Sequence, residues 1–200
     1  HRIARRQRQM CIRDSNDTDE IRRQISFMRE CQSKIKKIFA ICWGLQVAVT
    51  VAGGQVKKSD KGAHRGIAHN IKVNNIGSNH RVYLNKKKQF NSPAFNFDEV
   101  VKIPEGAILL SSNELNNVMG LNFKTNTSDI WGIQYHPEIT YEKMVSLIHF
   151  RKERLLNKGA FKDQDEINNH ILMIENEIKN SEKISRMKEL ENWINYLYEN

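Results

Sequence analysis

The spacing of apolar and polar residues predicts a helix, a buried strand and a second helix in the first part of the chain. Residues 19–33 place apolar side chains three and four positions apart, which is typical of an amphipathic helix. The short apolar run at 37–41 indicates a strand that is buried on both faces. Residues 42–52 are mostly apolar and favour a helix, which Gly53 and Gly54 end. This order of elements predicts an α/β fold.

A different pattern begins at Gly66. The chain then alternates turns rich in Asn, Ser and Gly with short β-rich segments, which lie at 71–73, 108–110, 118–123 and 130–134. Residues 141–156 return to a helical pattern, and the sequence beyond Lys158 is polar and helical. We expect an apolar stripe near the C-terminus to dock against the domain or against a partner, and this stripe consists of Met187, Leu190, Ile194 and Leu197.

The length of 200 residues suits one globular domain with an appended helical segment. We divide the chain into a head at 1–15, an α/β domain at 16–157 and a helical C-terminal extension at 158–200. The apolar stretches are too short to span a bilayer, and no secretory signal peptide is recognisable. We therefore expect a cytoplasmic protein that does not contact membranes.

The net charge of +9 raises the question of a nucleic-acid partner. Five Arg against one Asp give the head +4 and leave +5 for the other residues, whose lysines are interspersed with acids. An isolated basic head is more typical of an appendage than of a binding face, so we expect no nucleic-acid partner. The head resembles a translated sequencing adapter and has no apolar period, and we interpret it as non-native or disordered. A genuine basic arm is the alternative.

The three cysteines do not indicate a disulfide framework, because their number is odd and small. Cys11 lies in the head. Cys31 continues the apolar face of the helix at 19–33, where we expect it to pack as a small apolar side chain. Cys42 is the cysteine whose context suggests chemistry.

Cys42 lies between the predicted strand and the second predicted helix, in the sequence Ala-Ile-Cys-Trp-Gly. A nucleophile on such a turn projects at the carboxyl edge of the sheet. The nearby helix N-terminus favours the thiolate. We interpret Ala40 and Gly44 as small because neighbouring backbone passes close to the turn. The alternative is a buried cysteine that only packs.

A second motif, Gly-Ile-Gln-Tyr-His-Pro-Glu, occupies 132–138. A strand is expected to deliver His136 to its end, and Pro137 fixes the backbone after it. In extended geometry His136 and Glu138 project to the same side, so the carboxylate can hold one imidazole nitrogen while the other faces the Cys42 thiol. This arrangement activates a cysteine nucleophile. Taken alone, the motif is also compatible with an ordinary turn.

Together, the two motifs resemble those of class I (triad-type) glutamine amidotransferases. Ala-Ile-Cys-Trp-Gly-Leu-Gln is followed by Gly-Ile-Gln-Tyr-His-Pro-Glu, with the Cys and the His ninety-four residues apart. The resemblance runs from about residue 21 to about residue 150. It is most similar to the stand-alone subfamily that resembles the amidotransferase domain of GMP synthase, and the segments 92–100, 102–107 and 189–194 strengthen this match. The family implies a Rossmann-like, flavodoxin-like three-layer α/β/α fold.

The resemblance also implies a reaction. Cys42 would attack the side-chain amide of L-glutamine, and His136, oriented by Glu138, would protonate the departing ammonia. Water would then hydrolyse a glutamyl thioester. The backbone N–H of Trp43 would stabilise the oxyanion. No cofactor and no metal ion are implied.

Two further residues are expected to contact the substrate. Gln46 corresponds to a substrate contact of the family, and Asn96 stands at the pocket rim where relatives often have His. Ala40 replaces the usual Gly of the family. A helix alone precedes Cys42 here, whereas the family has strands before it, including a Gly-rich loop with a second oxyanion donor. We therefore expect a fragment that is truncated at its N-terminus and is a poor enzyme as it stands.

The resemblance leaves the ammonia acceptor open and suggests a synthetase or another ammonia-accepting partner. Two alternatives remain. One is a hydrolase of γ-glutamyl peptides or conjugates with the same triad, and the other is a non-catalytic regulatory relative.

Two further groups of residues have structural interpretations. His64, His69 and His80 match no ligand spacing, so we expect no metal site. The run of Lys86, Lys87 and Lys88 is interpreted as a solvated turn.

Overall fold

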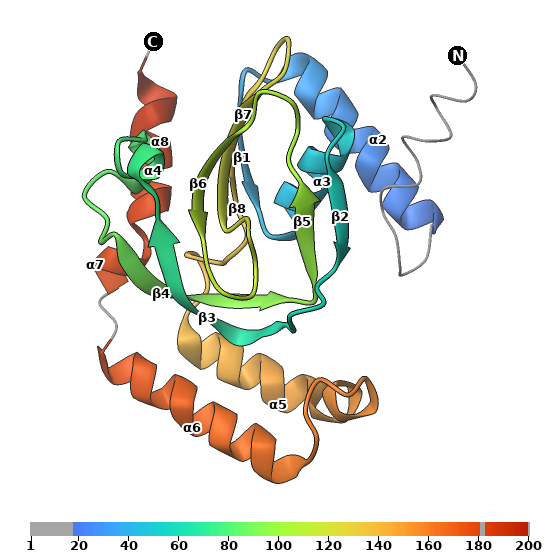
Figure 1. Ribbon diagram of the computed structural model, residues 1–200, viewed down its shortest axis with the longest axis vertical. Helices are drawn as coiled ribbons and strands as arrows, with labels where there is room; N and C mark the ends of the chain where they lie inside the picture. Colours follow the sequence, from blue (N-terminus) through green and yellow to red (C-terminus); the bar gives the residue numbers. More distant parts are fainter. Residues whose placement is uncertain (1–17, 181–182, 200) are drawn as a thin grey trace.

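The computed structural model describes residues 18–180 and 183–199 (Figure 1). The predicted head and Cys11 lie outside the described residues. The helices are α2 (Asp19–Lys34), α3 (Trp43–Val51), α4 (Asn75–Ser78), the 3-10 turn η1 (Arg81–Tyr83), α5 (Tyr141–Asn157), α6 (Gln164–Asn180), α7 (Lys183–Arg186) and α8 (Lys188–Tyr198). The strands are β1 (Lys37–Ile41), β2 (Gln55–Lys58), β3 (His64–Val73), β4 (Gln89–Asn96), β5 (Asp98–Lys102), β6 (Ile108–Ser112), β7 (Gly120–Lys124) and β8 (Asp129–Ile133).

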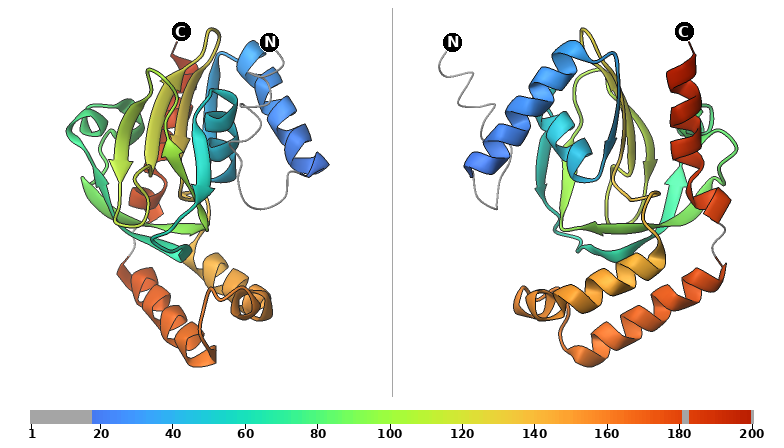
Figure 2. Two further views of the ribbon diagram at one scale, coloured as in Figure 1. Left: turned by 45° about the vertical axis from the view of Figure 1, so that its right-hand side comes forward. Right: turned by 180° about the vertical axis from the view of Figure 1, so that it is seen from behind.

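Six strands form one curled, mixed sheet, in the order β1-β8-β7-β6-β3-β4 (Figures 1 and 2). β1 and β8 run parallel, and the other neighbouring strands run antiparallel. β2 and β5 form a separate antiparallel pair. Because β1 and β8 are parallel neighbours, the segments that follow them leave the sheet at the same edge. This pairing brings the two predicted motifs together.

Helices cover the sheet on both faces (Figure 2). α2 and α3 lie on one face and α8 lies on the other, while α5 and α6 pack across the end formed by β3 and β4. β1 shows why both faces are covered. Ile38 and Ala40 pack into the core beside α3, whereas Phe39 and Ile41 pack into the core on the opposite face. The predicted α/β fold with helical C-terminal segments is confirmed.

A close approach between α3 and β8 involves Gly132. A Cβ atom at Gly132 would lie 2.4 Å from Cδ1 of Leu45, which is fully buried. Only glycine leaves room for this contact without a shift of the leucine. α3, which begins directly after Cys42, is thereby held against the strand that leads to His136.

Two members of the C-terminal apolar stripe, Ile194 and Leu197, do not dock against the domain, and docking of the stripe against a partner stays a prediction. The side chains of α8 that reach the sheet are Trp193, which stacks on Phe39, and Tyr196, which stacks on Trp131 at a centroid distance of 4.4 Å. Ile194 remains 52% exposed, and Leu197 is 47% exposed. The aromatic rings follow the same helical spacing as the aliphatic residues, and their larger apolar area decides which side docks.

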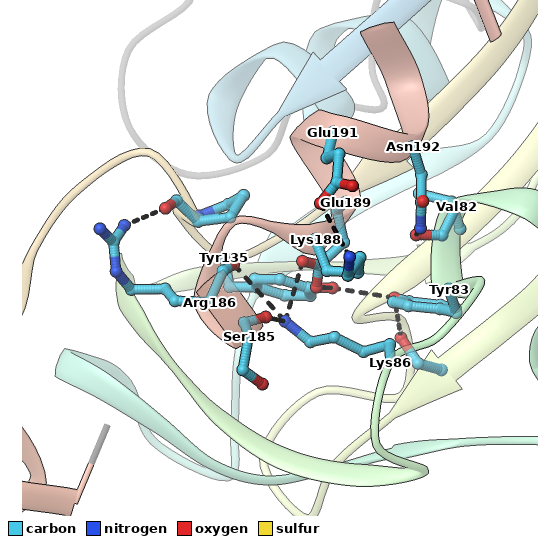
Figure 3. A network of polar contacts seen from close by, with 12 residues as sticks. Val82, Tyr83, Lys86, Tyr135, Ser185, Arg186, Lys188, Glu189, Glu191 and Asn192 are labelled. Atoms are coloured by element: carbon cyan, nitrogen blue, oxygen red, sulfur yellow. Dashed lines mark hydrogen bonds and ion pairs between the residues drawn. The ribbon is translucent and has the colours of Figure 1, made fainter. Parts of the chain in front are cut away.

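The interpretation of residues 86–88 as a solvated turn is wrong for Lys86. Its side chain is 2% exposed, and its Nζ lies 2.9 Å from Oε2 of Glu189, whose side chain is fully buried (Figure 3). Lys86 also donates to the carbonyl of Ser185, and the Tyr135 hydroxyl donates to Oε1 of Glu189 at 2.6 Å. Burial lowers the pKa of Lys86, and Glu189 opposes this change. The covering segment comes from α7 and α8, about a hundred residues later in the chain.

Within the described residues, no helix combines the length and the apolar character needed to cross a membrane.

Candidate active site

Cys42 occupies the turn between β1 and α3 in a left-handed backbone conformation, with a φ of 52°. Its N–H donates to the carbonyl of Ile133 at the end of β8 (2.7 Å), and its own carbonyl accepts from Gln46 in the first turn of α3 (3.2 Å). A left-handed non-glycine residue costs about 1–3 kcal/mol and is typical of functional positions. The explanation given for Gly44 is not supported, because a Cβ there would meet only Ala40 Cβ, at an ordinary 4.0 Å.

His136 lies beyond the end of β8 and begins a turn. Its Nδ1 is 2.6 Å from Oε1 of Glu138. The carbonyl of His136 accepts from Ile139, and its N–H donates to the carbonyl of Pro93 on β4 (2.7 Å). The predicted contact between the His136 imidazole and the Glu138 carboxylate is present. The prediction that residues 136–138 are extended is wrong. The turn at Pro137 folds the carboxylate back onto the ring.

The imidazole also interacts with the Cys42 thiol. Burial lowers the pKa of His136, but hydrogen bonding and charge interactions with Cys42 and Glu138 outweigh burial and raise the pKa to about 9. Because Nδ1 is engaged with Glu138, Nε2 is the ring nitrogen left for the thiol. The ring is therefore protonated at neutral pH and suited to stabilise a thiolate.

Gln134 was not singled out from the sequence. Its side chain is fully buried, and its Nε2 lies 3.5 Å from Sγ of Cys42. Its Oε1 accepts from Nε2 of Gln46, which also donates to the carbonyl of Asp98. The Gln134 amide is therefore a weak hydrogen-bond donor to the sulfur. The signal in the sequence that could have identified Gln134 as a site residue is its position two residues before His136, in the same motif.

Asn96 is buried at the end of β4. Its Nδ2 donates to the carbonyl of Asp98 (2.9 Å), and its Oδ1 accepts from Nδ1 of His64 (2.9 Å). The other ring nitrogen of His64 accepts from Asn113, so both are engaged. Burial lowers the pKa of His64. In the part of the chain that the structure describes, no cluster of three or more His, Cys, Asp or Glu side chains could hold a metal ion.

A cavity of about 250 Å³ opens beside the thiol. Three residues predicted around the substrate line it: Trp43, predicted for its backbone N–H, and Gln46 and Asn96, predicted for their side chains. Trp43 begins α3, so its backbone N–H has no acceptor within the helix. Its indole N–H donates to Gln24 on α2. The other lining residues are Cys42, Phe95, Phe97, Asp98, Arg151, Arg154, Leu155 and Lys158.

The turn that carries Glu138 is held from the far end of the chain. The guanidinium of Arg186 donates to the carbonyl of Pro137 and to that of Ile139, the latter at 3.0 Å. These carbonyls flank Glu138 on either side. Tyr135, the residue before His136, donates a buried hydrogen bond to Glu189 of α8 (Figure 3).

Comparison with known proteins points to one family. Residues 15–153 match the family described as Glutamine amidotransferase class-I. The chain is 30% identical over 142 residues to the gamma-glutamyl-L-1-hydroxyisopropylamide hydrolase of a Pseudomonas species, covering 70% of this chain and 48% of that protein. It is 29% identical over 144 residues to gamma-glutamyl peptidase 3 of Arabidopsis thaliana, covering 70% and 55%.

A third relative is a subunit of the glutamine-hydrolysing GMP synthase of Methanococcus vannielii, 28% identical over 111 residues, covering 56% of this chain and 55% of that protein. The chain spans about half the length of these curated relatives. Among solved structures, a glutamine amidotransferase from Thermotoga maritima shares the fold with a TM-score of 0.68 at 16% identity, covering 94% of this chain and 75% of that one. The family match extends over most of the chain, and the relatives agree with it: the chain belongs to the class I glutamine amidotransferases.

Proposed function

We propose that the chain hydrolyses the side-chain amide of L-glutamine, with Cys42 as the nucleophile, His136 as the proton donor and acceptor, and Glu138 as the group that orients His136. One observation carries this proposal. A cysteine held in a left-handed turn at a helix start interacts with an imidazole whose Nδ1 is 2.6 Å from a carboxylate. That combination is the one an activated thiol requires.

The proposed reaction has two halves. The Cys42 thiolate attacks the amide carbon, a C–S bond forms, and the carbonyl oxygen takes the negative charge beside the backbone N–H of Trp43. The C–N bond then breaks, and ammonia leaves with the proton of the His136 imidazolium. Water next attacks the glutamyl thioester and gives a proton to His136. The C–S bond breaks, glutamate leaves, and the thiolate–imidazolium pair is restored.

Three amide side chains complete the proposed site. Gln134 donates toward Sγ and supports its negative charge. Gln46 and Asn96 line the cavity and share the carbonyl of Asp98 as an acceptor, which places both amides at fixed positions. We assign them to substrate contact.

A second candidate is hydrolysis of γ-glutamyl amides that release an amine other than ammonia. The names of two relatives favour it, because one is a hydrolase of a γ-glutamyl amide and the other a γ-glutamyl peptidase. The relatives named as subunits of a glutamine-hydrolysing GMP synthase favour glutamine instead and suggest a synthetase partner that uses the ammonia. The two candidate reactions share the glutamyl part of the substrate and the same thioester intermediate, and they differ in the leaving amine.

The test is release of ammonia from L-glutamine by the wild-type chain and by two cysteine variants. We expect Cys42→Ala to lower turnover by about 10⁴-fold or more, because the covalent route is lost. Cys31→Ala removes a cysteine from α2, away from the cavity, and is expected to leave turnover unchanged. Equal turnover of Cys42→Ala and wild type would refute the proposal, as would the failure of the wild type to cleave L-glutamine and every γ-glutamyl amide tried.

A further inference from the structure

His64 is a buried residue at the start of β3 and does not line the cavity beside Cys42. Its Nδ1 lies 2.9 Å from Oδ1 of Asn96, which does line that cavity. Its Nε2 lies 2.9 Å from Nδ2 of Asn113. Each ring nitrogen therefore has a side-chain amide as its partner, and the backbone around Asn113 decides which nitrogen carries the proton.

The amide of Asn113 is oriented by two backbone groups. A backbone N–H donates and a backbone carbonyl accepts, so neither can exchange its role. Oδ1 of Asn113 accepts from the N–H of Asn116 (2.9 Å), and Nδ2 donates to the carbonyl of His69 (3.1 Å). The amide atom that faces Nε2 of His64 is therefore a donor, and Nε2 must accept.

The His64 ring then has one defined tautomer. Burial lowers the pKa of His64 more than its hydrogen bonds and the charge of Glu99 raise it, so the ring is neutral at neutral pH. A neutral imidazole that accepts at Nε2 carries its proton on Nδ1. Nδ1 is consequently the donor to Oδ1 of Asn96.

Two groups of fixed polarity thus hold the Asn96 amide. His64 donates to its oxygen, and the carbonyl of Asp98 accepts from its nitrogen at 2.9 Å. An amide nitrogen has a second hydrogen, and none of the hydrogen bonds among the described residues uses it. The Asp98 carbonyl also accepts from Gln46, so one backbone group orients both amides that we assign to substrate contact.

We infer that His64 is a positioning residue for substrate binding. Held as the Nδ1–H tautomer, it keeps the Asn96 amide turned so that Nδ2 presents an N–H to the bound substrate. The inference rests on the proposed function, because it takes Asn96 as a substrate contact. His64 acts through Asn96 alone and takes no part in the chemistry at Cys42.

The test compares His64→Asn with His64→Leu. The amide nitrogen of asparagine is two bonds from Cβ, as Nδ1 is in histidine, so His64→Asn keeps a donor for Asn96. Leucine has none and leaves the buried Oδ1 of Asn96 unsatisfied. Both variants lose the ring nitrogen that Asn113 contacts, so a merely structural role of His64 predicts equal effects.

We expect His64→Leu to raise KM for L-glutamine about 10-fold, which corresponds to the loss of one hydrogen bond to a charged group of the substrate. The value of kcat should stay within about threefold, because binding is weakened equally in the ground state and the transition state. His64→Asn should raise KM by less than about threefold. Equal KM values in the two variants, or a loss confined to kcat, would overturn the inference.

A binding measurement separates this inference from the proposed function. L-glutamate keeps the glutamyl part of the substrate and needs no turnover, so calorimetry should show the same order of affinities: wild type, His64→Asn, His64→Leu. This order without cleavage of L-glutamine by the wild type would refute the proposed function and retain the role of His64. Turnover with equal affinities in all three proteins would do the opposite, and a wild type that does not bind L-glutamate would overturn the inference.

The tautomer can be measured on the wild type whether or not the variants fold. Nitrogen-15 NMR of the imidazole groups at neutral pH should show His64 with its proton on Nδ1 and none on Nε2. A ring with its proton on Nε2, or a doubly protonated ring, would overturn the inference.

Discussion

Cys42 and His136 interact with each other, but different parts of the chain hold them in place. The conformation of Cys42 depends mainly on its immediate neighbours, a strand of five residues and the first turn of α3, and one hydrogen bond to a distant residue joins its N–H to the carbonyl of Ile133. His136 lies in a turn after β8, and its segment is held by residues that are distant in sequence. Pro93 accepts its N–H, and Arg186 binds the carbonyls on either side of Glu138.

This difference shows that the local sequence motif determines the position of Cys42, whereas tertiary contacts determine the position of His136. A thiol placed by strand, turn and helix needs little beyond these elements. An imidazole in a turn needs an external support, because a turn by itself leaves its side chains free to reorient. In this protein the support comes from α7, α8 and the buried contact of Glu189 with Lys86 and Tyr135 (Figure 3). The predictions below disturb that support in order of decreasing effect.

The largest effect is expected from Lys86→Met. This change leaves the Glu189 carboxylate buried without its cation, and breaking such a pair costs about 3–5 kcal/mol of the free energy of unfolding. Urea denaturation measures it. The double variant Lys86→Met/Glu189→Leu removes both charges and should recover most of the loss. A single variant within about 1 kcal/mol of wild type would show that the pair does not anchor α8.

Arg186→Gln should lower kcat for L-glutamine by about 10- to 100-fold, because small displacements of catalytic groups have effects of this size. KM should change little, since Arg186 does not line the cavity beside Cys42. Arg81→Gln is the matched control, because Arg81 pairs with Glu199 on an exposed surface. Unchanged kcat in Arg186→Gln would mean that the turn keeps Glu138 in place unaided.

The pKa of His136, raised to about 9 by its partners, should fall by about 1 unit in Glu138→Gln. NMR titration of the ring measures this change. The folded chain holds this proton more strongly than the unfolded chain does. The resulting contribution to stability is therefore fully present below the ordinary pKa of 6.5 and is lost as the pH rises through about 9. A ring that titrates at its ordinary value in the wild type would contradict the interaction with Cys42 and Glu138.

The smallest effect concerns the exposed side of α8. Ile194→Ala should change the free energy of unfolding by no more than about 0.5 kcal/mol, because the side chain is half exposed. Trp193→Ala, one residue earlier and stacked on Phe39, should cost more than about 2 kcal/mol. Equal effects of the two changes would restore the aliphatic stripe as a docking surface.

Much of the fold follows from local sequence. The helix at α2, the strand β1, the helix α3 and the helix α5 agree with the apolar periodicity, because each presents a regular apolar face to a core. The motifs around Cys42 and His136 were recognisable in the sequence, because the residues that form each motif are close together along the chain.

The support of His136 could not be predicted in the same way. The sequence around Lys86 does not indicate that Glu189, about a hundred residues later, pairs with it. A run of three lysines by itself favours a solvated turn. The contacts of Arg186 go to backbone carbonyls, which any sequence provides. The turn at Pro137 replaced an extended conformation because proline removes an N–H that a strand would use.

The central claim is that Cys42 forms a glutamyl thioester while His136 supplies the proton. The most direct measurement is mass spectrometry of peptides after the reaction with L-glutamine is stopped in acid within the first turnover. The account predicts a mass increase of one glutamyl group on the peptide that contains Cys42, present in wild type and absent in Cys42→Ala. Ammonia released without any such adduct, or an adduct on the peptide that contains Cys31, would contradict it.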